Sequence, residues 1–391
     1  DRLLSRGLGD VYKRQTLTVA NGTNANVTSS YDATGEHSGD VLDTSSSSHK
    51  DSDLDASATL TVKQIKKDGG SNSTVSSGSS YNSSGTSVTG TYGTLTIGAD
   101  GSYKYVADQD AADSIAASEQ QDDIFVYTIT DGTEDVSANI TITVLGENDN
   151  PTAQNDVGVI NEGSTLTVQN SSNANVSGSF DANGENSGDV IHTSSSSHKD
   201  SDPDTSNTLS ISHIKKSGGS NSTVSSGSSY NSSGTSVTGT YGTLTIGADG
   251  SYKYVADQDA ADSIAASEQQ DDIFVYTITD GTEDVSANIT ITVLGENDNP
   301  TAQNDVGVIN EGSTLTVQNS SNANVSGSFD ANGENSGDVI HTSSSSHKDS
   351  DPDTSNTLSI SQIKKNGGSN TDVSSGSSYN SSGTSVTGTY G

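Results

Sequence analysis

The feature of the sequence that most constrains the fold is an internal repeat with a period of 149 residues. Residues 69–212 recur without a single change as residues 218–361, and the same stretch begins a third time at Gly367. The match extends back to Thr16 and fails at Gln15. A fixed period of this length indicates that one folding unit is arrayed in tandem.

The hexapeptide GENDNP separates the repeats, since it occurs at residues 146–151 and again at residues 295–300. Cutting the chain at its proline predicts three units, namely 16–150, 151–299 and 300–391. We expect only the second unit to be complete, because the first lacks the opening strand and the third lacks everything after TGTYG. The chain contains no methionine, which also indicates a fragment of a longer protein.

Residues 1–15 differ in character from the rest of the chain. All three arginines fall here, and the segment carries a net charge of +2 against −37 for residues 16–391. A cleaved targeting segment would need an apolar central region, which DRLLSRGLGDVYKRQ lacks. Its end, DVYKRQ, resembles the translation of a transposon-end sequencing adapter of the kind found in metagenomic assemblies. We therefore expect residues 1–15 to be non-native.

The apolar residues of the complete unit gather into short alternating runs, which indicate β-strands. TLSISHI places Leu209 and Ile211 on one face of a strand. One hairpin is predicted from Leu244 to Tyr254 and a second across residues 273–295. QDAADSIAAS predicts a short helix between them, and the serine- and glycine-rich tracts predict long, mobile surface loops. The predicted fold is all-β, with small cores because only 28% of the residues are hydrophobic.

The charge of the chain limits its partners. A net charge of −35 argues against nucleic acid and anionic membranes, because binding to phosphate needs lysine and arginine, and it predicts a cation instead. The chain has no cysteine, which excludes disulfides and thiolate metal sites. No apolar run is long enough to span a bilayer.

Catalysis is not predicted. His192 and His198 flank a run of serines, and we expect exposed loop histidines there rather than zinc ligands, which need a fixed scaffold. Nothing around these serines resembles a nucleophile elbow. Tyr252 and Tyr254 have two interpretations, stacking on a sugar ring or packing in the core of the hairpin, and the second is favoured.

Several segments of the repeat resemble known families. The hairpin with the pattern G-x-L-x-I-x-x-D-G-x-Y-x-Y, the strand YTITDG and the closing GENDNP are similar to the VCBS repeat of large bacterial surface and secreted proteins. The opening part, from TAQNDVGVINEGSTLTV to DSDPDTSNTLSI, resembles cadherin-like bacterial domains. The resemblance covers residues 16–391 and implies tandem immunoglobulin-like or cadherin-like antiparallel β-sandwiches within an RTX-type adhesin exported by type I secretion.

GENDNP also resembles the calcium-binding linker D-x-N-D-N-x-P of cadherins. Aspartate and asparagine supply the hard oxygen ligands that Ca²⁺ prefers, and proline keeps itself and the preceding residue extended. Two like charges about 4 Å apart repel by about 1 kcal/mol in water and by about 4 kcal/mol at an effective dielectric near 20. We therefore expect Ca²⁺ to relieve this repulsion and to stiffen each joint.

Acidic groups preceding two strands are expected to gather at each linker. The candidate ligands at the first joint are Asp122, Asp123, Asn148, Asp149, Asn150, Asp200, Asp202 and Asp204. Those at the second joint are Glu162, Asp271, Asp272, Asn297, Asp298, Asn299, Asp349, Asp351 and Asp353. Lys13 corresponds to Glu162 at the first joint, so we expect weaker binding there. A role as turn formers stays open for DSDPD and is favoured for Asp249 and Asp280, each of which precedes a glycine.

Together with the resemblance, these features predict the extender repeats of a bacterial adhesin, secreted or bound to the cell surface, that acts in adhesion or biofilm formation. The predicted partners are calcium ions and neighbouring repeats of the same chain, with host or matrix glycans bound through other domains. Two alternatives remain open: a polysaccharide-binding module, and the spacer repeats of an exported hydrolase.

Overall fold

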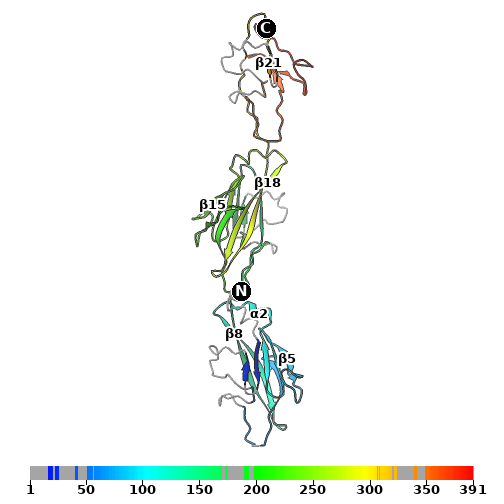
Figure 1. The fold of residues 1–391 in the computed structure, drawn as a ribbon, viewed down its shortest axis with the longest axis vertical. Coiled ribbons are helices and arrows are strands. Elements are labelled where there is room, and N and C mark those ends of the chain that lie inside the picture. The colour runs from blue at the N-terminus through cyan, green and yellow to red at the C-terminus, as the bar shows by residue number, and fades with distance from the viewer. Residues whose placement is uncertain are drawn as a thin grey trace. The chain divides into compact units, whose positions relative to one another are not determined.

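The computed structural model of the chain (Figure 1) describes residues 16–390 except 21–22, 26–39, 43–50, 56, 170–171, 175–188, 193–197, 306, 308, 319–320, 324–338 and 341–347. The chain divides into two compact units. Unit 1 comprises Asp1–Gln154, Lys199–Ser212 and Thr277–Ser286, and unit 2 comprises Asn155–His198, His213–Tyr276 and Ala287–Gly391. These units differ from the sequence repeats, since three segments of the second repeat, 151–154, 199–212 and 277–286, fall in unit 1.

The elements of the first repeat are β1 (Thr16–Ala20), β2 (Thr23–Ala25), β3 (Thr61–Lys67), β4 (Ser73–Thr74), β5 (Thr86–Thr89), β6 (Thr94–Ile97), β7 (Tyr103–Val106), α2 (Asp110–Asp113), β8 (Gln120–Thr130) and β9 (Asp135–Leu145). They form a five-stranded sheet in the order β2-β1-β7-β6-β5 and a four-stranded sheet in the order β4-β3-β8-β9. We call these two sheets the first sandwich.

The second repeat contains β10 (Asp156–Asn161), β11 (Thr165–Gln169), β12 (Ser172–Ala174), β13 (Ser210–Lys216), β14 (Ser222–Thr223), β15 (Thr235–Thr238), β16 (Thr243–Ile246), β17 (Tyr252–Val255), β18 (Gln269–Thr279) and β19 (Asp284–Leu294). Its sheets, which we call the second sandwich, run β12-β11-β17-β16-β15 and β10-β19-β18-β13-β14. The third repeat holds two-stranded pieces only among its described residues, formed by β20 (Thr316–Gln318) with β21 (Ser321–Ala323) and β22 (Gln362–Ile363) with β23 (Thr371–Asp372).

Each sandwich has a small apolar core between its two sheets, as the composition predicts. In the first sandwich, Phe125 and Ile65 from one sheet are fully buried with Leu95 from the other. The rings of Tyr105 and Phe125 meet edge to face across the core, with centroids 6.1 Å apart. Alternation along the strands therefore directs one face of each sheet inward.

Both predicted hairpins are confirmed. β16 pairs antiparallel with β17, with Leu244 opposite Tyr254. Along the second hairpin, alternate residues are buried: Phe274, Tyr276, Ile278, Ala287, Ile289, Ile291 and Val293. The predicted helix is a single turn, α2, in the first repeat, and the matching residues of the second repeat form a turn. Among the described residues, no helix is long and apolar enough to cross a membrane.

Strand β10 departs from the purely antiparallel arrangement that we expected. It pairs parallel with β19, from Asp156 opposite Ile289 to Asn161 opposite Leu294. The turn after β10 then carries the chain into the other sheet, where β11 pairs with β17. The first and last strands of the repeat consequently run side by side and end at the same edge of one sheet.

The serine-rich segment of residues 71–85 lies at the surface, as predicted, but hydrogen bonds fasten it to the sandwich. Ser79 is 3% exposed and its Oγ accepts from the Ala99 amide at 3.0 Å. Ser80 and Ser83 exchange two backbone hydrogen bonds of 3.0 Å. β4 adds to the edge of β3 within the same segment. The expectation of long mobile loops is therefore wrong for residues 71–85, because buried serines and an added strand fix their path.

Candidate metal centre

Linker residues 148 and 149 meet two other segments of unit 1. Asn148 Nδ2 donates to Asp280 Oδ2 at 2.8 Å. The Asp149 amide donates to Asp204 Oδ2 at 2.8 Å, and Asn207 Nδ2 donates to the same oxygen at 3.2 Å. We call this group the first acidic cluster; its members are Asn148, Asp149, Asp202, Asp204, Asn207 and Asp280.

The corresponding segments of unit 2 repeat this arrangement. The Asp298 amide donates to Asp353 Oδ2 at 3.1 Å, and Asn356 Nδ2 donates to the same oxygen at 2.6 Å. Glu162 joins from the turn after β10, where its Oε1 accepts from the Glu296 amide at 2.8 Å. We call this group the second acidic cluster; its members are Glu162, Asp262, Glu296, Asp298, Asp351, Asp353 and Asn356.

Turns within DSDPD hold its aspartates in place. Asp202 Oδ1 accepts from the Asp204 amide at 2.7 Å across Pro203, and Asp200 Oδ1 accepts from the Gln154 amide at 2.7 Å. The same contacts recur one repeat later in the pairs Asp353–Asp351 at 2.9 Å and Gln303–Asp349 at 2.7 Å. One carboxylate oxygen of Asp202 and of Asp351 thus forms a turn, while Asp200 and Asp349 attach the loop to the segment after the linker.

A threonine next to DSDPD attaches the loop to the residues after α2. The amide and hydroxyl of Thr205 both donate to the Ser114 carbonyl oxygen, at 3.3 and 3.1 Å. Thr354 makes the same pair of bonds with the Ser263 carbonyl oxygen, at 3.2 and 3.0 Å. This contact brings the acidic loop next to Asp262 in the second cluster without using any carboxylate.

Four carboxylate oxygens in the clusters are buried and have no hydrogen-bond partner among the described residues: Glu162 Oε2, Asp202 Oδ2, Asp298 Oδ2 and Asp353 Oδ1. Asp353 is only 2% exposed. A buried carboxylate oxygen without a donor is costly, because it has lost its hydration and gained nothing in return. One oxygen atom of the first cluster and three of the second therefore lack the positive charge or donor expected for a buried anion.

The carboxylates also raise one another's pKa values. Burial, followed by the charges of Asp298, Asp262 and Asp353, raises the pKa of Glu162. Burial, followed by the charges of Asp353, Asp262 and Asp351, raises the pKa of Asp298. In the first cluster burial, then Asp204 and Asp280, raises the pKa of Asp202. Both clusters consequently disfavour their own negative charge, as expected where like charges share a desolvated space.

Asp123 and Asp272 require a correction, because their carboxylates bind the protein itself. Asp272 is 1% exposed and accepts from the amides of Thr240, Tyr241 and Gly242 at 2.7, 2.9 and 3.2 Å. It also accepts from Tyr254 Oη at 2.8 Å. Asp123 makes the same four bonds in the first sandwich, with Thr91, Tyr92, Gly93 and Tyr105. We call this arrangement the aspartate clamp and leave both residues out of the metal site.

Asp122 and Asp271 precede the clamp residues and point to the opposite face of the strand. Both are exposed on β8 and β18, where they accept from the hydroxyls of Thr143 and Thr292 at 2.8 and 2.7 Å. Consecutive residues of a strand cannot face one site, since side chains alternate. The expectation that both aspartates of each pair join the cluster is therefore wrong.

The remaining linker amides have separate positions. The side-chain nitrogen of Asn297, Nδ2, donates to the carbonyl oxygen of Asp298 at 2.8 Å. Asn150 and Asn299 are exposed next to the prolines. Their role as ligands stays a prediction.

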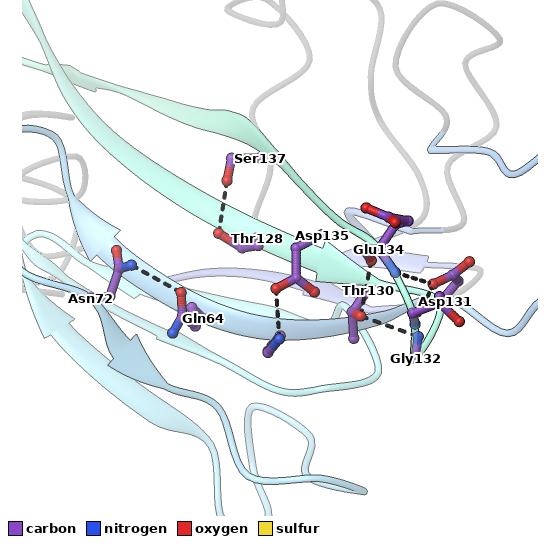
Figure 2. Close-up of polar contacts among 11 residues, drawn as sticks. Gln64, Asn72, Thr128, Thr130, Asp131, Gly132, Glu134, Asp135 and Ser137 are labelled. Atoms are coloured by element: carbon purple, nitrogen blue, oxygen red, sulfur yellow. Dashed lines mark hydrogen bonds and ion pairs between the residues drawn. The ribbon is translucent and has the colours of Figure 1, made fainter.

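Asp280 acts as a turn former, and it also reaches the linker. Its Oδ1 accepts from the amides of Thr282 and Glu283 at 2.6 and 2.7 Å, while Oδ2 binds Asn148. Figure 2 shows the equivalent turn of the first sandwich, where Asp131 Oδ1 accepts from the Thr133 and Glu134 amides at 2.7 and 2.8 Å. Hydrogen bonds to these amides and to Asn148 outweigh burial and lower the pKa of Asp280.

Sequence reasoning missed several members of the clusters: Asp262, Glu296, Asn207 and Asn356, together with the linker contact of Asp280. Asn207 and Asn356 lie three residues after the last aspartate of DSDPD, a spacing that could have marked them as turn partners. Asp262 carries no comparable signal, because DAADS reads as an ordinary helical turn. Within the described part of the chain, no three histidine, aspartate or glutamate side chains converge closely enough to form a ready-made metal cage.

The structure also places the two tyrosines and one of the histidines that the sequence singled out. Tyr252 and Tyr254 are 2% and 0% exposed, so neither can stack on a sugar, and packing in the core is confirmed. Burial and the neighbouring Asp272 charge raise the pKa of Tyr254, which keeps its hydroxyl a donor. His192 is exposed and its Nδ1 contacts Asp189 Oδ1 at 3.0 Å.

No family model and no curated protein matches the chain. Among solved structures, an endo-fucoidan hydrolase of glycoside hydrolase family 107 is 15% identical, with a TM-score of 0.19 over 54% of this chain and 23% of that one. The extracellular cadherin domains 1–5 of protocadherin gamma B2 are 16% identical, with a TM-score of 0.27 over 53% and 31%. Drosophila N-cadherin EC1–4 is 10% identical, with a TM-score of 0.25 over 63% and 44%. The chain thus spans less than half of each of these three, and likenesses this weak carry no argument about its function.

Proposed function

We propose that the chain forms the spacer repeats of an extracellular or surface-bound bacterial adhesin, and that calcium ions bound at the acidic clusters stiffen the GENDNP linkers. The observation that carries this proposal is the presence in both clusters of buried carboxylate oxygens without donors, one in the first cluster, from Asp202, and three in the second, from Glu162, Asp298 and Asp353. A divalent cation supplies the charge that these oxygens lack. The net charge of −35 favours the same kind of partner.

The chemistry of the clusters fits calcium better than other metals. Every side chain that could bind is a carboxylate or an amide, and calcium takes six to eight such oxygens in flexible geometry. The residues that would hold it in the first cluster are Asn148, Asp149, Asp202, Asp204 and Asp280. Those in the second cluster are Glu162, Asp262, Asp298, Asp351 and Asp353. Because the carboxylates do not yet converge, we expect their side chains to rotate inward on binding.

The chain's own residues prepare each linker for this change. Pro151 and Pro300 restrict the residues before them to extended geometry. The bonds of Thr205 and Thr354 to the Ser114 and Ser263 carbonyls position the DSDPD loops. A bound calcium ion would then connect the linker to the DSDPD loop. We expect a dissociation constant of about 10⁻⁴ to 10⁻³ M, which is usual for extracellular calcium modules.

Calorimetry and small-angle scattering of the whole chain test the proposal. We expect calcium to bind at millimolar concentrations or below, and a chelator to change the maximum dimension seen by scattering. The double variant Asp298→Asn with Asp353→Asn should lose the calcium bound at the second cluster. Asp271→Asn is the matched control, because Asp271 is an exposed aspartate outside the clusters, and it should bind calcium as the parent chain does.

Two results would contradict the proposal. One is an absence of calcium binding in the parent chain at physiological extracellular concentration. The other is binding without any difference in scattering between calcium and chelator, which would leave a metal site but remove the stiffening role.

A further inference from the structure

One turn recurs in all three repeats with a different residue at its second position in each. It spans residues 67–70 between β3 and β4, 216–219 between β13 and β14, and 365–368 between β22 and β23. The amide of its fourth residue donates to the carbonyl oxygen of its first at 2.8 Å each time, and its third residue is a glycine with φ of +75°, +77° and +78°. The second residue is Asp68, Ser217 and Asn366 in turn. Three side chains thus occupy one backbone geometry.

Asn366 differs from the other asparagines that the structure describes. Among the described residues it is the only asparagine followed by glycine, and its side chain is exposed and forms no hydrogen bond with any of them. By contrast, Asn370 Nδ2 donates to Gln362 Oε1 at 2.7 Å, and Asn380 Oδ1 accepts from Ser378 Oγ at 2.8 Å. The amide group of Asn366 is therefore free to turn toward the peptide bond that follows it.

The peptide bond between Asn366 and Gly367 is equally open. The closing hydrogen bond of the turn comes from the amide of its fourth residue, Gly368, so the turn leaves the Gly367 amide unengaged. A Cβ built on Gly367 would meet nothing within 4 Å, and glycine has no side chain that could crowd a ring formed at its nitrogen. Asp68 and Ser217 are exposed at the same position of the first two repeats, so the openness is a property of the turn itself.

We propose that Asn366 is a site of spontaneous deamidation. The Gly367 nitrogen attacks Cγ of Asn366, the bond between Cγ and Nδ2 breaks, and ammonia leaves with the proton of the Gly367 amide. Water then adds to the resulting succinimide ring. Breaking the bond between Cγ and the ring nitrogen gives aspartate. Breaking the bond between the main-chain carbonyl carbon and that nitrogen gives isoaspartate, in which the backbone runs through the side chain.

The two products differ in what they do to the turn. Asp68 already occupies this position in the first repeat, with the same closing hydrogen bond and the same glycine conformation. Conversion to aspartate therefore adds a negative charge at the surface and requires no new backbone. Isoaspartate instead lengthens the backbone between the paired strands β22 and β23, and we expect their pairing to loosen. Neither product involves a residue of the acidic clusters, so the reaction is independent of calcium.

Peptide mapping by mass spectrometry tests the proposal on the whole chain. Samples are incubated at mildly alkaline pH with chelator, either folded in buffer or unfolded in urea. We expect Asn366 to change from the mass of an amide to that of a carboxylic acid in both samples, and chromatography to separate an aspartate from an isoaspartate peptide. Asn370 and Asn380 should keep their amides over the same time. The sequence also has Asn-Gly at residues 21–22, 183–184 and 332–333, which lie outside the described residues and are mapped separately.

Gly367→Ala is the matched variant, because it keeps the asparagine and changes only the residue whose nitrogen attacks. It should slow the conversion of Asn366 at least about tenfold, and the urea sample shows this effect without any contribution from the fold. Conversion in urea but not in the folded chain would mean that the turn protects Asn366, and it would overturn the proposal. An unchanged rate in the Gly367→Ala variant, or equal conversion of Asn366 and Asn370, would contradict it as well.

Discussion

Replacing both clamp aspartates with alanine, Asp123 in the first sandwich and Asp272 in the second, should strongly destabilise the chain. In each sandwich the change leaves three amides and one tyrosine hydroxyl without their acceptor. The bonds from Gly242 and Tyr254 to Asp272 are buried, so water cannot readily replace the carboxylate there. A buried donor left without a partner costs about 1–3 kcal/mol. Counting mainly these two donors, we expect a loss of about 3–5 kcal/mol per sandwich.

Urea denaturation followed by circular dichroism measures this loss. With a slope near 2 kcal/mol per molar urea, the unfolding midpoint should fall by roughly 2 M. Both clamp aspartates must be changed, because with a single substitution the unaltered sandwich would still contribute its full share of the circular dichroism change on unfolding. The matched control replaces Asp122 and Asp271, the neighbouring exposed aspartates, for which we expect less than about 0.5 kcal/mol.

The result also decides between two roles for the same residues. If the aspartate clamp is structural, the midpoint falls without calcium and calcium affinity of the folded chain is unchanged. Equal midpoint shifts for the two double variants would refute the reasoning from burial. An unchanged midpoint combined with weaker calcium binding would show that Asp123 and Asp272 are ligands after all.

Three further predictions concern single positions. Gly250→Ala should lower the free energy of unfolding by about 2 kcal/mol, because the glycine has φ of +86° and a Cβ would lie 2.9 Å from Asp189 Oδ1. The control is Gly281→Ala, which has open space around it and should lower the melting temperature less. Lys63 donates to Asp135 at 2.6 Å (Figure 2) and lowers its pKa, so this bond stabilises the fold above pH 3.8 and is lost as the pH falls through the lowered pKa. Lys63→Ser should therefore lower the melting temperature at pH 7 but not at pH 2, and a constant difference would contradict the assignment. Asp280→Asn should weaken calcium binding at the first cluster and leave the urea midpoint unchanged, since asparagine can still accept from the turn amides; unchanged calorimetry would remove Asp280 from the site.

The strands were predictable because their apolar residues alternate. Phe274, Tyr276 and Ile278 identify the buried face of β18 without any structure, and all three are fully buried. The parallel pairing of β10 was not predictable, because VGVIN is apolar on both faces and its pattern does not say which strand lies beside it. Only the path of the turn after Asn161 into the other sheet settles this.

The candidate site was predictable in part, for a related reason. The meeting of GENDNP with DSDPD was predicted because DSDPD precedes a strand at the end of the repeat nearest the preceding linker. The two aspartates before Phe274 misled the prediction, because alternation along β18 separates Asp271 from Asp272 and a core tyrosine takes the latter. Asp262 was missed because its approach to Glu162 and Asp298 depends on tertiary packing alone.

The parallel pairing of β10 with β19 determines how the second sandwich responds to tension. The linker at Pro151 precedes β10 and the linker at Gly295 follows β19, so force applied through both linkers pulls the two strands in opposite directions along their length. Six residue pairs are then loaded at once in shear, whereas an antiparallel hairpin would open one pair at a time. Single-molecule stretching should therefore record a higher rupture force for the second sandwich than for the first, whose described strands lack this pairing, and equal forces would show that the pair bears no load.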